Sequence, residues 1–349
     1  MQNTQNANHI SSGSPRRIGI TMGCPAGIGP EIILRFVTGK RAFGQFLPIV
    51  IGDIDHLDRC AKELQVDIEI VPWKPGDAGS LEKLLVIQPG PGEGYELNTA
   101  KVHWGKPDRA TGHAAAAYIT KAVRLIEQGM LDAMTTCPVS KYALHLAGYD
   151  FPGHTEMLAS LCKAENYGMM MAGKLLKVSL VTIHMPLARV CGQLSQEEIV
   201  RIIHLTGETL IRDFGISRPR IAVAGFNPHG GEAGLFGEEE KLVIEPAVSG
   251  AVSERWEVFG PLPPDTVFKS AMDSKYDAVI AMYHDQGLIP FKLVHFEDGV
   301  NLTMGLPIIR TSVDHGTAYD IAGKGLASAS SLEASFAMAA EIIVHRENY

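Results

Sequence analysis

Three histidines in this chain follow short apolar runs that predict buried β-strands. The runs cover residues 178–183, 221–226 and 278–283, and the histidines that follow them are His184, His229 and His284. In open α/β sheets, ligands bind outside the carboxyl ends of the strands. Imidazole nitrogens are preferred ligands of zinc and its neighbours. A single such histidine would more often be structural, but three with the same placement favour a divalent metal site.

Asp285 and Lys292 follow the third of these histidines and are the candidate catalytic residues. Asp285 could orient His284, bind the metal itself or act as a base. Lys292 stands between Phe291 and Leu293, and an apolar environment would lower its pKa and suit proton transfer. The alternative is a surface lysine whose stem covers apolar side chains.

A second group of polar residues suits an anionic ligand such as a phosphate or a carboxylate. His154 and Thr155 are adjacent, and the same pair would also suit the beginning of a helix. Asn301 and Arg310 bracket an apolar run, and Arg310 at its end can form a two-pronged contact with an anion. His315 follows in a polar run and is a fourth metal candidate.

Gly23, Gly27 and Gly29 lie in a loop between a predicted strand and a predicted helix. Glycine permits positive φ and close backbone approach, and a helix start favours an anion. The loop is therefore a candidate cofactor-binding site, although it matches neither GxGxxG nor a Walker A motif. A tight turn with Pro30 at the first helical position explains it equally well.

The composition is that of a globular protein, with 46% hydrophobic and 20% charged residues. The net charge of −8 argues against a nucleic-acid partner and against an anionic membrane surface. No apolar run approaches the ~18 residues of a membrane span, and residues 1–15 lack the apolar segment of a signal peptide. The five cysteines form no CxxC pair, which favours reduced thiols in the cytoplasm.

Strand-like and helix-like stretches alternate along the chain, which predicts an α/β fold with a mostly parallel sheet. The expected strands include 17–22, 48–52 and 132–136, and the expected helices are 30–37, 56–64, 111–128, 195–214 and 323–346. Ser195 and Glu198 predict a capping box. Residues 1–15 are expected to be a disordered tail, 72–94 an irregular exposed segment, and 238–241 a solvated helix start.

Five of these motifs together resemble one known family. They are residues 22–31 (MGCPAGIGPE), 153–156 (GHTE), 227–232 (NPHGGE), 283–287 (YHDQG) and 309–317 (IRTSVDHGT). The chain resembles the 4-hydroxythreonine-4-phosphate dehydrogenase family of vitamin B6 biosynthesis from about Arg17 to its last helix. Cys24 is a departure, because family members often have an acid at that position.

The resemblance implies an enzyme that oxidises the C3 hydroxyl of 4-phosphooxy-L-threonine with NAD or NADP. The resulting β-keto acid would lose CO2 and give 3-amino-2-oxopropyl phosphate. One divalent metal (Zn, Co, Mn or Mg) would be held by three histidines, one of them from the partner subunit, and Asp285 or Lys292 would take the hydroxyl proton. The implied metal ligands are His184, His229 and His284, and the implied substrate contacts are His154, Thr155, Lys292, Asn301 and Arg310.

The resemblance also implies a homodimer with an isocitrate/isopropylmalate-dehydrogenase-like fold of two α/β lobes. The active site would lie in the cleft between the lobes and be shared between subunits. We place the first lobe at residues 16–135 plus 311–349 and the second, which carries the metal and substrate residues, at 136–310.

Several alternatives stay open at this point. Sister enzymes with the same motifs oxidise 4-phospho-D-threonate or erythronate, and others oxidise aromatic dihydrodiols. His154, Lys292 and Arg310 suit a phosphorylated substrate and weigh against the dihydrodiols. A metal-dependent sugar-phosphate lyase would need no nicotinamide, and a binding protein without turnover ranks last. No acid or arginine in the sequence distinguishes NAD from NADP.

Overall fold

The structure is a computed structural model that describes residues 15–39, 43–74, 77, 79–80, 82–91, 95, 97–151 and 153–349. The predicted tail falls on residues 1–14, which lie outside the described residues, and on Pro15. The strands are β1 (Arg16–Thr21), β2 (Phe46–Ile51), β3 (Glu69–Pro72), β4 (Lys83–Ile87), β5 (Ala133–Thr136), β6 (Gly168–Ala172), β7 (Lys177–Leu180), β8 (Arg220–Ala224), β9 (Glu257–Leu262), β10 (Ala278–Ala281), β11 (Val300–Met304) and β12 (Arg310–Val313). The longer helices are α1 (Gly29–Thr38), α2 (Ile54–Glu63), α3 (Arg109–Glu127), α5 (His154–Leu161), α7 (Gln196–Arg212), α9 (Pro264–Met272), α10 (His284–Val294) and α11 (Ser330–Glu347). The shorter ones are α4 (Lys141–Leu146), α6 (Leu187–Val190), α8 (Glu245–Gly250) and the irregular turns η2 (Thr99–Lys101), η3 (Cys191–Gln193), η4 (Pro228–Gly234) and η5 (Glu240–Ile244).

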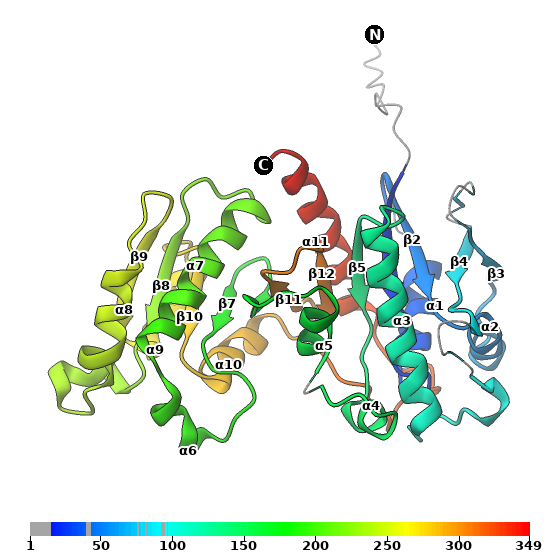
Figure 1. Ribbon diagram of the computed structural model, residues 1–349, viewed down its shortest axis with the longest axis horizontal. Helices are drawn as coiled ribbons and strands as arrows, with labels where there is room; N and C mark the ends of the chain where they lie inside the picture. Colours follow the sequence, from blue (N-terminus) through cyan, green and yellow to red (C-terminus); the bar gives the residue numbers. More distant parts are fainter. Residues whose placement is uncertain are drawn as a thin grey trace, which may run out of the picture.

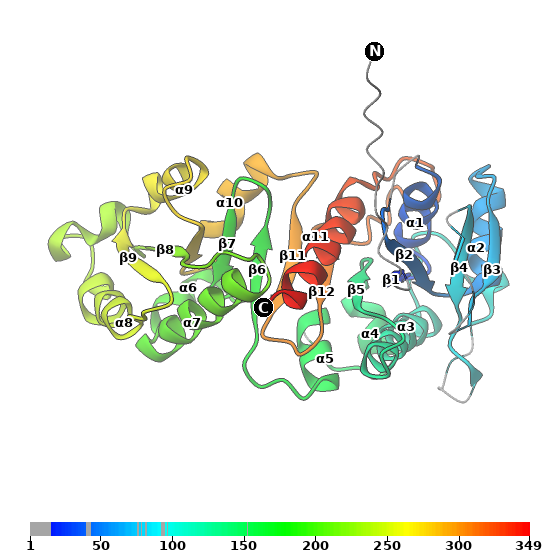
Figure 2. The same cartoon turned by 90° about the horizontal axis from the view of Figure 1, so that it is seen from above.

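Within the described residues, twelve strands form one sheet in the order β3-β4-β2-β1-β5-β12-β11-β6-β7-β10-β8-β9. The pairs β11–β12, β11–β6 and β6–β7 are antiparallel, and the other neighbours are parallel. Helices cover both faces: Figure 2 shows α1 and α9 on one side, and α3, α5, α7 and α8 on the other. The predicted α/β fold with a mostly parallel sheet is confirmed, whereas the lobe boundaries remain a prediction.

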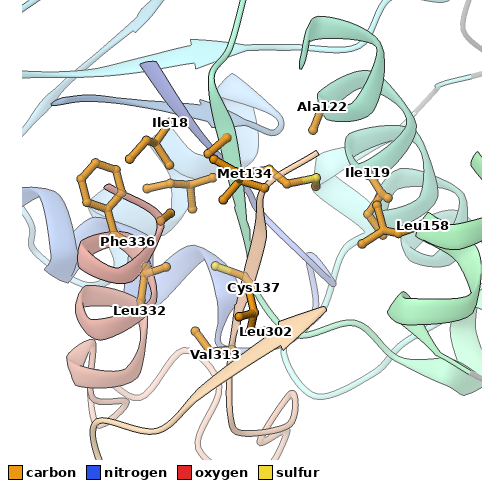
Figure 3. Close-up of a cluster of buried hydrophobic side chains, with 14 of the residues drawn as sticks. Ile18, Ile119, Ala122, Met134, Cys137, Leu158, Leu302, Val313, Leu332 and Phe336 are labelled. Carbon is orange, nitrogen blue, oxygen red and sulfur yellow. The ribbon is translucent and has the colours of Figure 1, made fainter. Parts of the chain in front are cut away.

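The core around the middle of the sheet joins segments that are far apart in the sequence. Figure 3 shows Ile18, Met134, Leu302 and Val313 of neighbouring strands, with Leu332 and Phe336 of α11 on one side and Ile119, Ala122 and Leu158 on the other. Burying a side chain of the size of leucine or phenylalanine stabilises a protein by roughly 1.5–3 kcal/mol. This packing fixes β5, β11 and β12 relative to one another, and these three strands carry much of the site described below.

Most predicted helices are present, with boundaries moved by a few residues. Ser195 accepts a hydrogen bond from the Glu198 amide at 3.2 Å, as the predicted cap requires. The Glu198 carboxylate binds Arg201 instead of completing the capping box. The last helix begins at Ser330 rather than at residue 323. In the described part of the chain no helix is both long and apolar enough to span a membrane.

The expectation that residues 72–94 are irregular and exposed was wrong for β4. Residues 84–87 of this strand are buried, and β4 pairs with β2 and β3 in the parallel sheet. The many glycines and prolines of the flanking loops led to the prediction of a loop, although residues 84–87 between them form a short apolar run. A strand buried on both faces shows no polar alternation, so composition alone did not reveal it. Residues 75–76, 78, 81 and 92–94 of this segment lie outside the described residues.

A buried polar network ties α2 to the first glycine loop. Asp53 caps α2 by accepting the His56 amide at 2.8 Å, and its second oxygen accepts the Tyr95 hydroxyl at 2.6 Å. Nε2 of His56 lies 2.9 Å from the Pro25 carbonyl oxygen, so the neutral ring donates to that carbonyl. Burial lowers the pKa of His56 to about 4, partly offset by the Pro25 hydrogen bond.

We therefore expect acid to destabilise the fold through His56. The unfolded chain binds a proton near pH 6.5, while the folded ring stays neutral until about pH 4, so stability is lost as the pH falls through this window. Between pH 7 and pH 5 the free energy of unfolding should fall by about 2 kcal/mol more in the wild type than in His56→Gln. Denaturant titrations at both pH values measure this difference. Equal pH dependence in the two proteins would contradict the assignment.

Candidate active site

A cavity of about 160 Å³ lies where β5, β11 and β12 meet α4 and α5. Its walls include His154, Thr155, His184, Asn301, Arg310 and His315. Four predicted substrate-binding residues therefore meet one predicted metal ligand. They converge because His154 and Thr155 open α5, while Asn301 and Arg310 lie on the antiparallel strands β11 and β12.

Arg310 is a buried cation whose hydrogen-bond partners are neutral. Its side chain is 1% exposed, and it donates to the hydroxyls of Thr303 and Thr136, both at 2.8 Å. Burial lowers the pKa of Arg310 to about 9, opposed by the more distant Glu156 carboxylate, so the guanidinium remains charged at neutral pH. A buried charge is costly unless an opposite charge offsets it, and an anionic ligand would do so here.

Several buried polar atoms at this cavity have no hydrogen-bond partner within the described chain. They are Nε2 of His154, Nε of Arg310, Oδ1 of Asn301 and Nε2 of His315. Buried polar groups are normally hydrogen-bonded, and exceptions call for a bound ligand or water. Burial, with the positive charge of Arg310, holds the pKa of His154 well below its usual value. The cavity therefore offers the buried Arg310 cation, neutral imidazoles and an amide oxygen to a polar, anionic ligand.

The rings of His184 and His284 lie together, with centroids 5.7 Å apart. β7 and β10 are parallel neighbours, so the residues after their carboxyl ends meet at one edge. Both histidines and Asp285 line a second cavity of about 410 Å³, and His184 also lines the first. Nδ1 of His284 is 2.7 Å from Oδ1 of Asp285. That contact would fix the tautomer and leave Nε2 free to bind a metal.

The donor chemistry of this pair fits a divalent metal. Burial lowers the pKa of His184, and the charge of Lys141 lowers it further, so its ring is neutral at physiological pH. Neutral imidazoles supported by a carboxylate are the usual ligands of zinc and related metals. Two ligands do not complete a site, and the described residues hold no group of three or more His, Cys, Asp or Glu side chains arranged around a metal position.

His229 does not join the pair within this chain. It lies in η4 after β8, its side chain is 62% exposed, and its Nδ1 is 3.8 Å from Oδ2 of Asp265. His315 lines the first cavity with Arg310 and His184, but it does not line the second cavity with His284. The three-histidine metal site thus remains a prediction.

Lys292 lies in the last turn of α10, at the opposite end of the helix from His284, and it contacts Asp314. Its Nζ donates to the Asp314 carbonyl at 3.1 Å and is 3.3 Å from the carboxylate. Burial raises the pKa of Asp314, opposed by Lys292 and by the nearby His315 and His284. The apolar surroundings inferred for Lys292 from its sequence neighbours are not present, because its 41% exposed side chain forms this ion pair. The sequence neighbours Phe291 and Leu293 were a poor guide to the surroundings of Lys292, because consecutive residues of a helix point in different directions.

The three glycines of the first loop are packed against the protein's own backbone. A Cβ at Gly23 would lie 2.3 Å from the Pro138 carbonyl oxygen, and one at Gly29 would lie 2.1 Å from that of Met22. A Cβ at Gly27 would lie 3.0 Å from the Thr317 carbonyl oxygen, which is a tight but less severe approach. The tight-turn explanation therefore accounts for these residues, and their role in binding a nicotinamide cofactor stays a prediction. The thiol of the buried Cys24 accepts the Tyr319 hydroxyl at 3.4 Å.

Sequence reasoning missed several residues that shape the site. Thr136 and Thr303 accept hydrogen bonds from the guanidinium of Arg310. The only sequence signal for this role was the position of Thr136 at the end of a predicted strand. Lys141 and Glu156 also line the first cavity. The prediction that residues 238–241 are a solvated helix start was wrong for Glu240, which is 3% exposed. Its carboxylate accepts backbone amides, a role that a run of charges in the sequence does not reveal.

Comparison with known proteins supports one family over nearly the whole chain. Residues 45–339 match the family described as pyridoxal phosphate biosynthetic protein PdxA. The chain is 49% identical over 328 residues to 4-hydroxythreonine-4-phosphate dehydrogenase of Desulforapulum autotrophicum, covering 93% of this chain and 94% of that protein. It is 40% identical to D-threonate 4-phosphate dehydrogenase of Salmonella typhimurium, covering 94% and 99%. A crystal structure of 4-hydroxythreonine-4-phosphate dehydrogenase from Klebsiella pneumoniae has a TM-score of 0.84 at 40% identity, covering 94% of this chain and 99% of that one.

These matches extend over the segments that build both cavities. They confirm the family that the sequence motifs indicated, and the similar proteins are named as dehydrogenases. The chain, a member of a family of oxidoreductases, belongs to the pyridoxal phosphate biosynthetic protein PdxA family.

Proposed function

We propose that this protein oxidises the C3 hydroxyl of 4-phosphooxy-L-threonine with NAD or NADP, and that loss of CO2 then gives 3-amino-2-oxopropyl phosphate. The observation that carries this proposal is the buried cation Arg310, which shares a cavity with His184, whose ring lies beside that of His284. A phosphate bound at Arg310 would place the rest of a short substrate toward the histidine pair. The similar proteins named as dehydrogenases acting on phosphorylated threonine derivatives support the same assignment.

The phosphate contacts are proposed for His154, Thr155, Asn301 and Arg310. Arg310 supplies the charge, and its fixed planar fork suits the tetrahedral oxygens of a phosphate. The neutral His154 and the hydroxyl of Thr155 can donate to the same group. Lys292, which contacts Asp314, would contact the reacting end of the substrate.

His184 and His284 would hold the divalent metal, with His229 of a second copy as the third ligand in a homodimer. The exposure of His229 on a loop supports its role as the ligand donated to another subunit. When bound, the metal would supply Lewis-acid polarisation of the C3 oxygen and the nicotinamide would supply a hydride acceptor. Asp285 orients His284 through Nδ1. Either Asp285 or Lys292 would take the proton of the C3 hydroxyl.

4-Phospho-D-threonate is the second candidate substrate. The Salmonella typhimurium relative is named for that activity, and a phosphate site at Arg310 suits both molecules. They differ where one carries an ammonium group and the other a hydroxyl. A metal-dependent lyase would use the same histidines and phosphate cation but would not reduce a nicotinamide.

We propose a cytoplasmic location for this activity. All five cysteines are free thiols, and reduced thiols persist in the cytoplasm.

The test is NAD(P)H formation by the purified, metal-loaded protein with the two candidate substrates side by side. We expect a higher kcat/KM for 4-phosphooxy-L-threonine than for 4-phospho-D-threonate. The opposite preference would make the protein a sugar-acid dehydrogenase. No reduction of either nicotinamide with either substrate would contradict the dehydrogenase proposal and favour the lyase.

A further inference from the structure

The turn that carries His229 has an unusual backbone. Residues 229–233 in η4 all have positive φ, between 43° and 82°. Three of them, His229, Glu232 and Ala233, carry side chains that disfavour this region. Such strain persists only where the surrounding structure holds it in place. The turn follows β8 at the left of Figure 1, near α8 and α9.

Glu240, the first residue of η5, holds the beginning of this turn. Its Oε1 accepts the amides of Phe226 and Asn227 at 2.7 and 2.6 Å, and its Oε2 accepts Nδ2 of Asn227 at 2.9 Å. The carboxylate is also close to the turn itself, since a Cβ at Gly231 would lie 2.6 Å from Oε2. Hydrogen bonds from backbone amides to a buried carboxylate are among the stronger kinds.

The other side of the same segment is tied to the histidine pair. Gln286, two residues after His284, donates from Nε2 to the Gly225 carbonyl at 2.7 Å, and its Oε1 accepts the Met282 amide at 2.7 Å. The Gly225 amide donates to the Leu262 carbonyl at 2.8 Å. Gly225 is thus fixed to α10 and β9, and the residues after it are fixed by Glu240.

We infer that Glu240 is a positioning residue that holds the left-handed turn and directs His229 toward its metal position. This inference rests on the proposed role of His229 as a metal ligand. Without Glu240, the amides of Phe226 and Asn227 would lose their acceptor, and the strained turn could relax to other conformations. His229 would then spend less time in its binding position, and metal affinity would fall without loss of any ligand.

The test measures Co²⁺ binding by calorimetry to full-length protein, together with hydrogen exchange of residues 226–234 and the unfolding temperature. Glu240→Ala should weaken Co²⁺ binding by roughly 10–100-fold and speed exchange in this segment. Glu240→Gln, which keeps one acceptor oxygen for the two backbone amides, should restore part of the affinity. Glu238→Ala is the matched control, because it removes an exposed carboxylate from the same segment and should leave binding unchanged.

The outcomes separate this inference from the proposal on which it rests. Equal Co²⁺ binding by wild type and His229→Ala would overturn the metal role of His229, and the inference with it. Weaker binding by His229→Ala but unchanged binding by Glu240→Ala would overturn the inference alone. If Glu240→Ala does not fold, Glu240→Gln decides: weaker binding at an unchanged unfolding temperature supports the positioning role, and wild-type binding overturns it.

Discussion

Replacing His229 by alanine is expected to abolish NAD(P)H formation and to weaken divalent-metal binding at least about a hundredfold. Loss of a supporting group outside the ligand shell already costs about 10–100-fold in metal affinity, and here a ligand itself is lost. His229 is exposed, and its side chain lies 3.8 Å from the Asp265 carboxylate and beside the Phe236 ring, so the substitution should leave the unfolding temperature almost unchanged. Calorimetry with Zn²⁺ or Co²⁺ and steady-state turnover measure the two effects.

Mixed dimers can show whether His229 acts in the same subunit or across the interface. His184→Ala and His229→Ala should each be inactive alone. If the ligand crosses between subunits, a mixed dimer has one intact site, because each chain supplies what the other lacks. Random mixing should then restore up to about a quarter of wild-type activity, since half of the dimers are mixed and one of their two sites is intact. Full activity in metal-stripped His229→Ala would exclude the metal role altogether.

Replacing Arg310 by alanine should raise KM on the order of a hundredfold, with a smaller change in kcat. A buried charge pair costs 2–5 kcal/mol or more when one partner is removed, and here the partner is the substrate's phosphate. Without substrate, the Arg310 side chain donates to the hydroxyls of Thr136 and Thr303, and its Nε has no partner among the described residues. Its removal therefore breaks no ion pair with the part of the chain that the structure describes. Steady-state kinetics and thermal unfolding separate lost binding from lost stability.

Two further variants make this prediction specific. Arg310→Lys keeps the charge but lacks the planar fork whose two terminal nitrogens bind the two threonines, so it should recover only part of the affinity. Thr303→Val removes one support of the guanidinium and should raise KM only several-fold. An equal loss of activity in Arg310→Ala toward the phosphorylated substrate and its dephosphorylated form would place the phosphate elsewhere.

The sequence by itself predicted the strand ends and hence much of the site. Buried parallel strands are continuous apolar runs, so the polar residue that ends each run is visible without a structure. This pattern placed His184 and His284 after strands, and the sheet order, in which β7 and β10 are neighbours, then brings the two rings together. The motifs around these residues also identified the family before any comparison.

Only the tertiary structure decided which residues support these side chains. The guanidinium of Arg310 donates hydrogen bonds to hydroxyls of β5 and β11. These strands lie beside β12 because of long-range pairing in the sheet, which no local sequence pattern encodes. Glu240 lies in a run of charged residues, which predicts that its side chain is exposed to solvent. In the structure the side chain is buried, and its carboxylate accepts hydrogen bonds from backbone amides. His229 follows a strand like its two counterparts, but it lies in the turn η4 beyond β8 and does not line the cavity of His184 and His284. The hydrophobic pattern of the sequence predicts which residues end a strand. A charged side chain can be buried only where hydrogen-bond partners surround it, and folding brings these partners together from distant parts of the chain.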